Sequence, residues 1–248
     1  MEKSVNLVAH RGYTLNYPEN TLVGLGAAIE AGANFLEVDI QLSKDKVPFL
    51  FHDRDMQRLC DQAGSLHDYT ASELNEFRAS DSGRFGNKFA DNPITTLLDL
   101  VGLMQTHPKV TVFIELKRSS LEKFGIEFMV EQVLSTLEPV KDQCVIISYS
   151  IEALAYVSEQ YQWPIGAVHD DWEERNNEAI ADLNPQYFFC DLETVPAEGD
   201  LKLNNTHLAV YECTDPKLAV ALHKRGIEFV ETFAIGEMLE QTRDIAGN

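Results

Sequence analysis

Short apolar runs alternate with amphipathic segments along this chain, and that alternation restricts its fold more than any other feature. An apolar run at 5–9 is followed by a helical spacing that starts near Pro18 and by a second apolar run at 35–42. A strand, a helix and a second strand within about forty residues form the repeating unit of a parallel sheet. The same alternation predicts further strands at 110–116, 144–148, 165–168, 187–190, 208–211 and 227–231.

The segments between these runs have helical spacing of their apolar residues. Helices are expected at 97–104, 121–138, 150–160, 172–182, 215–225 and 235–245, with a short helix near 70–78 and irregular structure near 192–204. Eight strand–helix units in 248 residues predict a (β/α)8 TIM barrel, with residues 1–248 forming one domain. An open, doubly wound sheet is the alternative. No G-x-G-x-x-G follows any of the strands, which weakens this alternative.

The apolar run at 47–52 does not fit among the parallel strands. Only the four polar residues at 43–46 separate it from the run at 35–42, whereas a parallel crossover needs a dozen or more residues. We therefore expect an antiparallel hairpin. With Lys44 and Asp45 as its turn residues, Glu37 would lie opposite His52, at roughly 5 Å between their Cβ atoms. Residues 54–93 are weakly periodic and rich in small polar residues, which predicts an insertion over the barrel mouth.

Titratable side chains follow the ends of the first three parallel strands, where the active residues of such barrels lie. They are His10 and Arg11, then Glu37 and Asp39, then Glu115 and Lys117, with His52 from the hairpin. Three carboxylates on neighbouring strands repel one another unless a cation lies between them, and oxygen ligands favour one Mg²⁺ or Ca²⁺ ion. The arginine and the lysine suit a phosphate beside that ion, and two histidines can act as general base and general acid.

Each of these features also has a structural interpretation. A single histidine at a strand end is commonly structural, and an E-x-D or E-x-K pair is commonly a solvated face or an ion pair within the sheet. Their occurrence together at successive strand ends favours a site. His169, His207 and His223 lie outside this pattern, and we interpret them as structural or solvated.

Charge and cysteine content limit the partners and the compartment. The chain has 40 acidic and 20 basic residues, a net charge of −20, which disfavours binding to nucleic acid and to anionic membrane surfaces. Its four cysteines form no C-x-x-C pair, as expected in a reducing compartment. No apolar stretch approaches the ~18 residues of a membrane span. The first apolar strand leaves no room for a signal peptide before His10. We expect a cytoplasmic protein with no integral membrane association.

The motifs together resemble one known family. His10-Arg11-Gly12, Pro18-Glu19-Asn20-Thr21, Glu37-Val38-Asp39, His52-Asp53 and Glu115-Leu116-Lys117 are similar in order and spacing to those of the glycerophosphodiester phosphodiesterase family, in particular its short bacterial cytoplasmic members. The resemblance is specific over residues 8–53 and 112–117. Elsewhere the chain resembles the family only as a barrel of suitable length.

The resemblance implies a metal-dependent hydrolase that converts glycerophosphodiesters to glycerol 3-phosphate and an alcohol. It implies that Glu37, Asp39 and Glu115 hold the divalent cation. His10 and His52 would be the acid–base pair, and Arg11 and Lys117 would bind the phosphate. In the family's proposed chemistry the substrate's own glycerol hydroxyl attacks phosphorus, and water then opens the cyclic phosphate.

The chain departs from the family pattern at its last two strands. It has Tyr211-Glu212-Cys213-Thr214 where many members have an aromatic-Thr-Val-Asn, and Glu231-Thr232-Phe233 where a Thr-Asp is common. These positions line the mouth, so the departure concerns substrate preference. Tyr149, Tyr211 and Phe233 are candidates for the substrate pocket, with ordinary barrel packing as the alternative.

Three other functions fit some of the same residues. A cyclising phospholipase-type phosphodiesterase would use the same two histidines, although no amphipathic membrane helix is evident. A carbonyl enzyme could use Lys117 as a Schiff base, but the glycine-rich turns expected after strands 7 and 8 are missing. A non-catalytic barrel could bind metal and phosphate alone. The preferred alcohol, the choice between Mg²⁺ and Ca²⁺, and the oligomeric state stay open.

Overall fold

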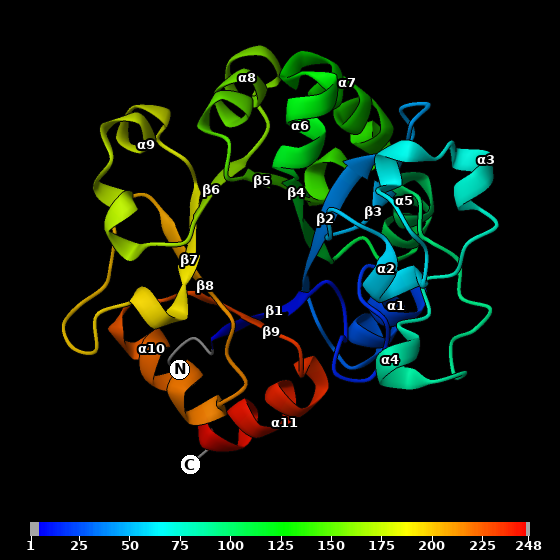
Figure 1. Cartoon of the computed structure of the whole chain (residues 1–248). Coiled ribbons are helices and arrows are strands. Elements are labelled where there is room, and N and C mark those ends of the chain that lie inside the picture. The colour runs from blue at the N-terminus through cyan, green and yellow to red at the C-terminus, as the bar shows by residue number, and fades with distance from the viewer. Residues whose placement is uncertain (1–4, 247–248) are drawn as a thin grey trace.

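The strands of the computed structural model, which describes residues 5–246, close into a parallel barrel surrounded by helices (Figure 1). Within these residues, nine strands form one sheet in the order β1-β9-β8-β7-β6-β5-β4-β2-β3, and the pairing of β1 with β2 closes it. The predicted (β/α)8 barrel is thus confirmed, and the open sheet does not form. The strands are β1 (Asn6–His10), β2 (Phe35–Leu42), β3 (Pro48–Leu50), β4 (Thr111–Leu116), β5 (Cys144–Ser148), β6 (Ile165–His169), β7 (Tyr187–Asp191), β8 (His207–Tyr211) and β9 (Phe229–Thr232).

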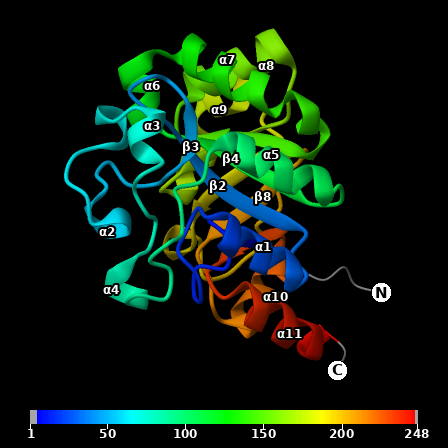
Figure 2. The same ribbon diagram turned by 90° about the vertical axis from the view of Figure 1, so that its right-hand side faces the viewer.

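Helices cover the outside of the barrel, as the two perpendicular views show (Figures 1 and 2). None of the helices within residues 5–246 is long and apolar enough to cross a membrane. The α-helices are α1 (Leu22–Glu30), α2 (Gln57–Cys60), α3 (Ala71–Leu74), α4 (Ser82–Phe85), α5 (Leu97–Thr106), α6 (Arg118–Phe124), α7 (Ile126–Leu137), α8 (Ile151–Tyr161), α9 (Glu178–Leu183), α10 (Pro216–Arg225) and α11 (Ile235–Ala246). Four short 3₁₀ helices are also described, at Leu66–Asp68, Glu138–Gln143, Trp172–Asn176 and Leu192–Thr194.

Two apolar layers hold the barrel together. Strand residues that point outward pack against the helices in one large cluster, which includes Leu36, Ile114 and Ile146. Strand residues that point inward form a smaller cluster on the barrel axis, made of Val8, Phe113, Val145, Ile147, Val168, Phe189, Ala209 and Phe229. The inner cluster is a packed floor, so the polar groups that also point inward lie at the carboxyl ends of the strands.

Strand β2 is longer than its neighbours, and this extension carries the hairpin. Its first residues pair with β1, and Ile40–Leu42 pair with the antiparallel strand β3. The predicted hairpin therefore forms, but its predicted register was wrong by one residue, because Ile40 pairs with Leu50 rather than with Phe49. The loop has three residues, Lys44–Lys46, and Lys46 has a left-handed conformation with φ 69°. A turn followed by a left-handed residue is the usual three-residue hairpin loop.

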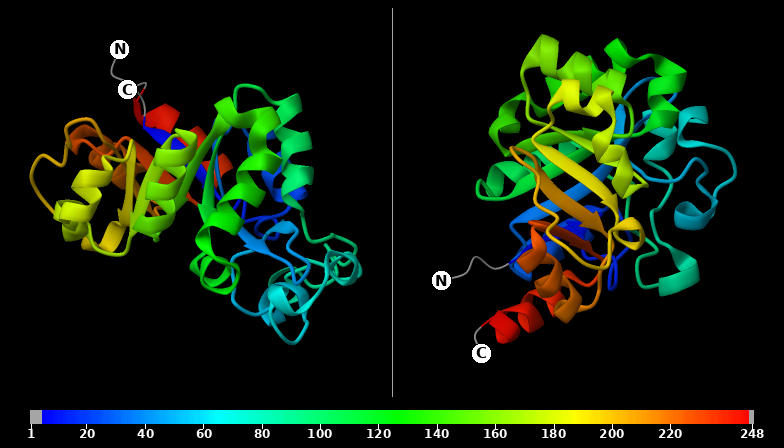
Figure 3. Two further views of the ribbon diagram at one scale, coloured as in Figure 1. Left: turned by 90° about the horizontal axis from the view of Figure 1, so that it is seen from above. Right: turned by 90° about the vertical axis from the view of Figure 1, so that its left-hand side faces the viewer.

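In the observed register, Glu37 and His52 do not form the predicted face-to-face pair. Pairing between β2 and β3 ends at Leu50, and His52 lies in the loop that follows. That loop leads into a segment with its own small core, which contains Phe49, Phe51, Met56, Leu59, Cys60, Leu66, Leu74, Ala79 and Ile94. The segment with α2, α3 and α4 projects from the end toward which the parallel strands point (Figures 2 and 3). His52 thus reaches the site from this segment.

Two predicted helices are interrupted. The predicted helix at 121–138 is α6 and α7, which meet at Gly125 with φ 87°, a conformation that β-carbon sterics reserve largely for glycine. The predicted helix at 172–182 is a 3₁₀ turn followed by α9. The turn after β1 also depends on a glycine. Gly12 has φ 96°, and a β-carbon there would lie 2.9 Å from the backbone carbon of Gly24 in α1. This close approach holds the Arg11 loop against α1.

Candidate active site

Three carboxylates from adjacent strands meet at the carboxyl end of the barrel. Glu37 and Asp39 belong to β2 and Glu115 belongs to β4, where Asp39 and Glu115 are register partners. One oxygen from each of the three lies within 4.8 Å of the others, and all three residues are 0–9% exposed. The structure thus brings together the three residues predicted to hold a cation.

Asp39 is held by cationic and amide groups on both oxygens. Lys117 Nζ is 3.1 Å from Asp39 Oδ1 and 2.9 Å from Glu115 Oε1, and Arg11 Nε is 3.0 Å from Asp39 Oδ2. Asn20 donates to Asp39 Oδ2 at 2.9 Å. Burial alone would raise the pKa of Asp39, but the charges of Lys117 and Arg11 outweigh it and hold that pKa well below its usual range. Asp39 is therefore ionised.

Glu37 has a different environment. Its Oε2 accepts a 3.2 Å hydrogen bond from the backbone N–H of Arg11, and its Oε1 is buried without a hydrogen-bond partner. Burial and the nearby charges of Asp39 and Glu231 raise its pKa well above the usual value. A buried oxygen without a partner, beside two further carboxylates, matches the all-oxygen ligand set of a hard divalent cation. The residues present thus fit such an ion.

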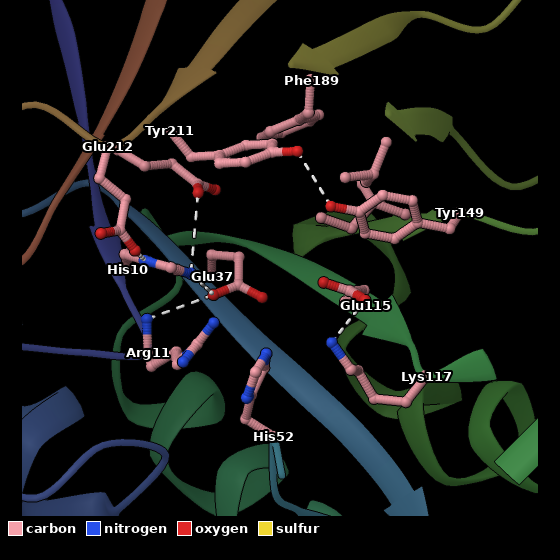
Figure 4. A pocket seen from close by; sticks show the side chains of 13 residues that line it. His10, Arg11, Glu37, His52, Glu115, Lys117, Tyr149, Phe189, Tyr211 and Glu212 are labelled. Carbon is pink, nitrogen blue, oxygen red and sulfur yellow. Dashed lines mark hydrogen bonds and ion pairs between the residues drawn. The ribbon is translucent and has the colours of Figure 1, made fainter. Parts of the chain in front are cut away.

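His10, at the end of β1, is surrounded by acidic groups (Figure 4). Its Nδ1 contacts the carboxylate of Glu212, and its Nε2 lies 3.6 Å from Glu37 Oε2 and 3.9 Å from Glu231 Oε2. The ring stacks on Phe233, with centroids 5.5 Å apart. Burial, reinforced by the charge of Arg11, lowers the pKa of His10. A neutral imidazole whose Nδ1 is occupied presents Nε2 to the cavity.

His52 is connected to the barrel through a chain of ion pairs. Its Nδ1 is 2.9 Å from Asp53 Oδ1, and Asp53 Oδ2 is 2.7 Å from Arg58 Nε. The two terminal nitrogens of Arg58 bind Glu19 at 2.7 and 2.9 Å. Glu19 Oε1 also lies 3.6 Å from Arg11 Nη1. Arg58 in α2 thus joins the loop that carries His52 to the loop that carries Arg11.

Replacing Arg58 with methionine is expected to lower the free energy of unfolding by about 1–2 kcal/mol, because Glu19 would lose a bidentate partner while buried. The Arg58 side chain is 43% exposed, so solvent screening keeps the loss below that of a fully buried pair. Urea unfolding measures it. Arg78→Met is the matched control, since Arg78 donates only to nearby backbone carbonyl oxygens. Equal losses in the two variants would show that the ion-pair chain adds nothing to stability.

A cavity of about 130 Å³ is formed by these groups together with an aromatic and aliphatic wall. The hydroxyl oxygens of Tyr149 and Tyr211 are 2.9 Å apart, and both contact Asp170. Phe233 lines an adjoining cavity that also contacts His52 and Arg11. The first cavity is lined by His10, Arg11, Glu37, His52, Glu115, Lys117, Ile147, Tyr149, Val168, Phe189, Tyr211, Glu212 and Glu231. The predicted pocket residues thus border the predicted chemical centre.

Sequence reasoning left four of the residues at this centre without a role. Glu212 and Glu231 follow the rule that functional groups lie at strand carboxyl ends, and that rule could have identified them. Glu19 and Arg58 gave a weaker signal, because Arg58 lies in a segment of low periodicity. The histidines set aside as structural have structural contacts: His169 stacks on Phe188, His207 pairs with Glu228, and His223 contacts the carbonyl oxygen of Ile227.

Comparisons with known proteins identify relatives of this chain. Two curated bacterial glycerophosphodiester phosphodiesterases are similar in sequence. The one from Bacillus altitudinis is 32% identical over 149 residues, 60% of this chain and 60% of that protein. The one from Caldanaerobacter subterraneus subsp. tengcongensis is 35% identical over 144 residues, 57% of this chain and 56% of that protein. The matches thus span less than two thirds of the length of either relative.

Solved structures show the same fold. A phosphodiesterase from Oleispira antarctica, in complex with the product sn-glycerol-3-phosphate, matches with a TM-score of 0.85 and 21% identity over 97% of both chains. A glycerophosphodiester phosphodiesterase from Thermotoga maritima matches with a TM-score of 0.71 and 23% identity, over 97% of this chain and 100% of that one. A family model covers residues 10–231, from the first histidine of the site to its last glutamate. The chain belongs to the glycerophosphoryl diester phosphodiesterase family.

Proposed function

We propose that this protein hydrolyses glycerophosphodiesters to glycerol 3-phosphate and an alcohol, with a bound divalent cation. The observation that carries the proposal is one cavity that contains two histidines, two cationic side chains and a cluster of carboxylates. Family membership and the names of the curated relatives support the same reaction. The proposed substrate is a small molecule, which fits a cavity of this size.

In the proposed mechanism the substrate supplies the nucleophile. His10 Nε2 takes the proton of the glycerol hydroxyl next to the phosphate ester, and that oxygen bonds to phosphorus. The bond between phosphorus and the alcohol oxygen breaks, and His52 gives its proton to the leaving alcohol. The histidines then exchange roles: His52 takes a proton from water as the water oxygen bonds to phosphorus. The bond between phosphorus and the glycerol oxygen that attacked breaks, and His10 returns its proton to that oxygen. An adjacent hydroxyl needs no separate association, which lowers the entropic barrier.

Arg11 and Lys117 have the charge and the position to hold the phosphate. Both line the cavity, and both already face the carboxylate cluster through Asp39. Glu37, Asp39 and Glu115 would hold the cation, Mg²⁺ or Ca²⁺, which when bound supplies positive charge beside the phosphate oxygens. The Glu212 carboxylate holds His10 in the tautomer that carries its proton on Nδ1, which leaves Nε2 free to accept.

Glycerol 3-phosphate release from glycerophosphocholine and glycerophosphoethanolamine tests the proposal. We expect release that stops with EDTA and returns with Mg²⁺ or Ca²⁺, and much slower release from the His10→Ala variant purified in parallel. Phosphorus NMR of the products separates the remaining alternatives. A cyclic phosphate that persists would indicate a cyclising phosphodiesterase. Binding of metal and phosphodiester without turnover would indicate a binding protein.

We also propose a cytoplasmic location. The four cysteines of the chain, Cys60, Cys144, Cys190 and Cys213, are buried and form no disulfide, which suits a reducing compartment. Cell fractionation tests this proposal, and recovery of the protein in an extracytoplasmic fraction would contradict it.

A further inference from the structure

Glu231 is a buried acidic side chain that the proposed mechanism does not use. It lies in β9, is 3% exposed, and lines the cavity beside His10. Its Oε1 has no hydrogen-bond partner. Among the described residues it belongs to neither group of side chains close enough to share a metal ion. Buried polar groups are nearly always paired, so a carboxyl left open toward a cavity points to a missing partner.

The position of Glu231 relative to His10 indicates what that partner is. Glu231 Oε2 is 3.9 Å from His10 Nε2, the nitrogen that Glu212 leaves free. In the proposed reaction the attacking hydroxyl lies against this same nitrogen. Glycerol carries its second free hydroxyl on the adjacent carbon, so that group falls beside the one that attacks. Glu37, the other carboxylate near Nε2, belongs to the carboxylate cluster. Glu231 is therefore the hydrogen-bond acceptor that remains without a partner beside the attacking hydroxyl.

The position of the side chain suits a hydroxyl better than a cation. Glu231 lies outside the group formed by Glu37, Asp39 and Glu115, and its Oε1 has no hydrogen-bond partner. A carboxyl oxygen accepts a hydrogen bond from a hydroxyl. The carboxyl also lies deep in the barrel, since Glu231 is the register partner of Val8 in β1, one of the inner-cluster residues.

We propose that Glu231 binds the terminal hydroxyl of the substrate's glycerol and so makes the enzyme select glycerol over related diols. This inference rests on the proposed function, with His10 as the initial base. It assigns a specificity-determining role to a position where the chain departs from the usual pattern of its family. A site with a buried polar group for a substrate hydroxyl rejects the analogue that lacks it, because the group is left unpaired.

The test compares two substrates and three forms of the enzyme. The substrates are glycerophosphoethanolamine and its analogue built on propane-1,2-diol, which keeps the attacking hydroxyl and lacks the terminal one. We expect the wild type to prefer the glycerol substrate in kcat/KM by about 10–100-fold. Glu231→Ala should lose most of that preference, and Glu231→Gln should keep part of it because the amide still forms hydrogen bonds. Glu228→Ala, at the opposite end of the barrel, is the control that should keep the full preference.

Each possible result is informative. Equal rates of the wild type on both substrates, or an undiminished preference in Glu231→Ala, would overturn the inference, and the first comparison needs no variant. Calorimetric titration with Mg²⁺ and Ca²⁺ should give unchanged affinities in Glu231→Ala, whereas a large loss would make Glu231 a cation ligand and overturn the inference. Failure of the proposed function would give a distinct result: the wild type would release no glycerol 3-phosphate from glycerophosphocholine or glycerophosphoethanolamine.

Discussion

Replacing His10 with alanine is expected to lower kcat by about 10²–10⁴-fold, the usual contribution of a positioned general acid or base. The variant would lose the group that removes the proton from the attacking hydroxyl, and no other histidine contacts Glu212 or Glu231 among the described ion pairs. The measurement is release of glycerol 3-phosphate under saturating substrate. His207→Ala is the matched control, because His207 pairs with Glu228 at the amino end of β8, away from the cavity.

His52→Ala should cause a loss of similar size, and a change of leaving group separates the two roles. A p-nitrophenyl ester of glycerol 3-phosphate releases an anion that needs no proton. His52→Ala should recover most of its rate on that substrate, whereas His10→Ala should not. Recovery of the His10 variant instead would exchange the assignments. Full activity of either variant on glycerophosphocholine would remove that histidine from the mechanism altogether.

Replacing Glu37 with glutamine is expected to weaken binding of Mg²⁺ or Ca²⁺ by about 100-fold or more. Loss of an outer partner of a metal ligand already costs 10–100-fold, and Glu37 is a proposed ligand itself. The amide keeps the shape of the side chain and removes its charge. Calorimetric titration measures the affinity, and turnover should fall in parallel at limiting metal. Glu30→Gln, on the exposed end of α1, is the control. An unchanged titration curve for Glu37→Gln would exclude this residue from the cation site.

The same substitution should stabilise the metal-free protein. Burial raises the pKa of Glu37 above its usual 4.5, and the charges of Asp39 and Glu231 raise it further. Between 4.5 and the raised value, the folded protein keeps a proton that the unfolded chain has released, so this group's contribution to stability falls as pH rises. Glutamine does not ionise, so the Glu37→Gln variant does not lose stability in this way as the pH rises. The difference in Tm between variant and wild type, measured in EDTA, should therefore widen as the pH rises above 4.5.

Local sequence was sufficient to predict the barrel and the proximity of the charged residues. Strand pairing in a closed parallel barrel brings every carboxyl end to one rim, so Glu37 and Glu115 had to approach one another once their strands were recognised. The hairpin register was not predictable in the same way. It depends on whether Lys46 adopts a left-handed backbone, and a non-glycine residue gives little sign of that choice.

The remaining parts of the site depend on long-range packing. Arg58 meets Glu19 because the small core around Phe51 and Leu59 holds α2 against the barrel, and no periodicity in the sequence indicates that position. Glu212 and Glu231 reach His10 only through barrel closure. Their presence at strand ends suggested a role at the mouth, but the direction of each side chain needed the structure.

Closure of the barrel also sets the order in which a growing polypeptide acquires its chemistry. One edge of β1 pairs with β9, and about 220 residues of synthesis separate these strands, which takes roughly 10–45 s at typical ribosomal rates. Through that interval one edge of β1 has no native partner, and the contacts of His10 with Glu212 and Glu231 are not complete. A nascent chain that has not reached β9 therefore lacks part of this site, and the unpaired edge of β1 is open to pairing with another chain.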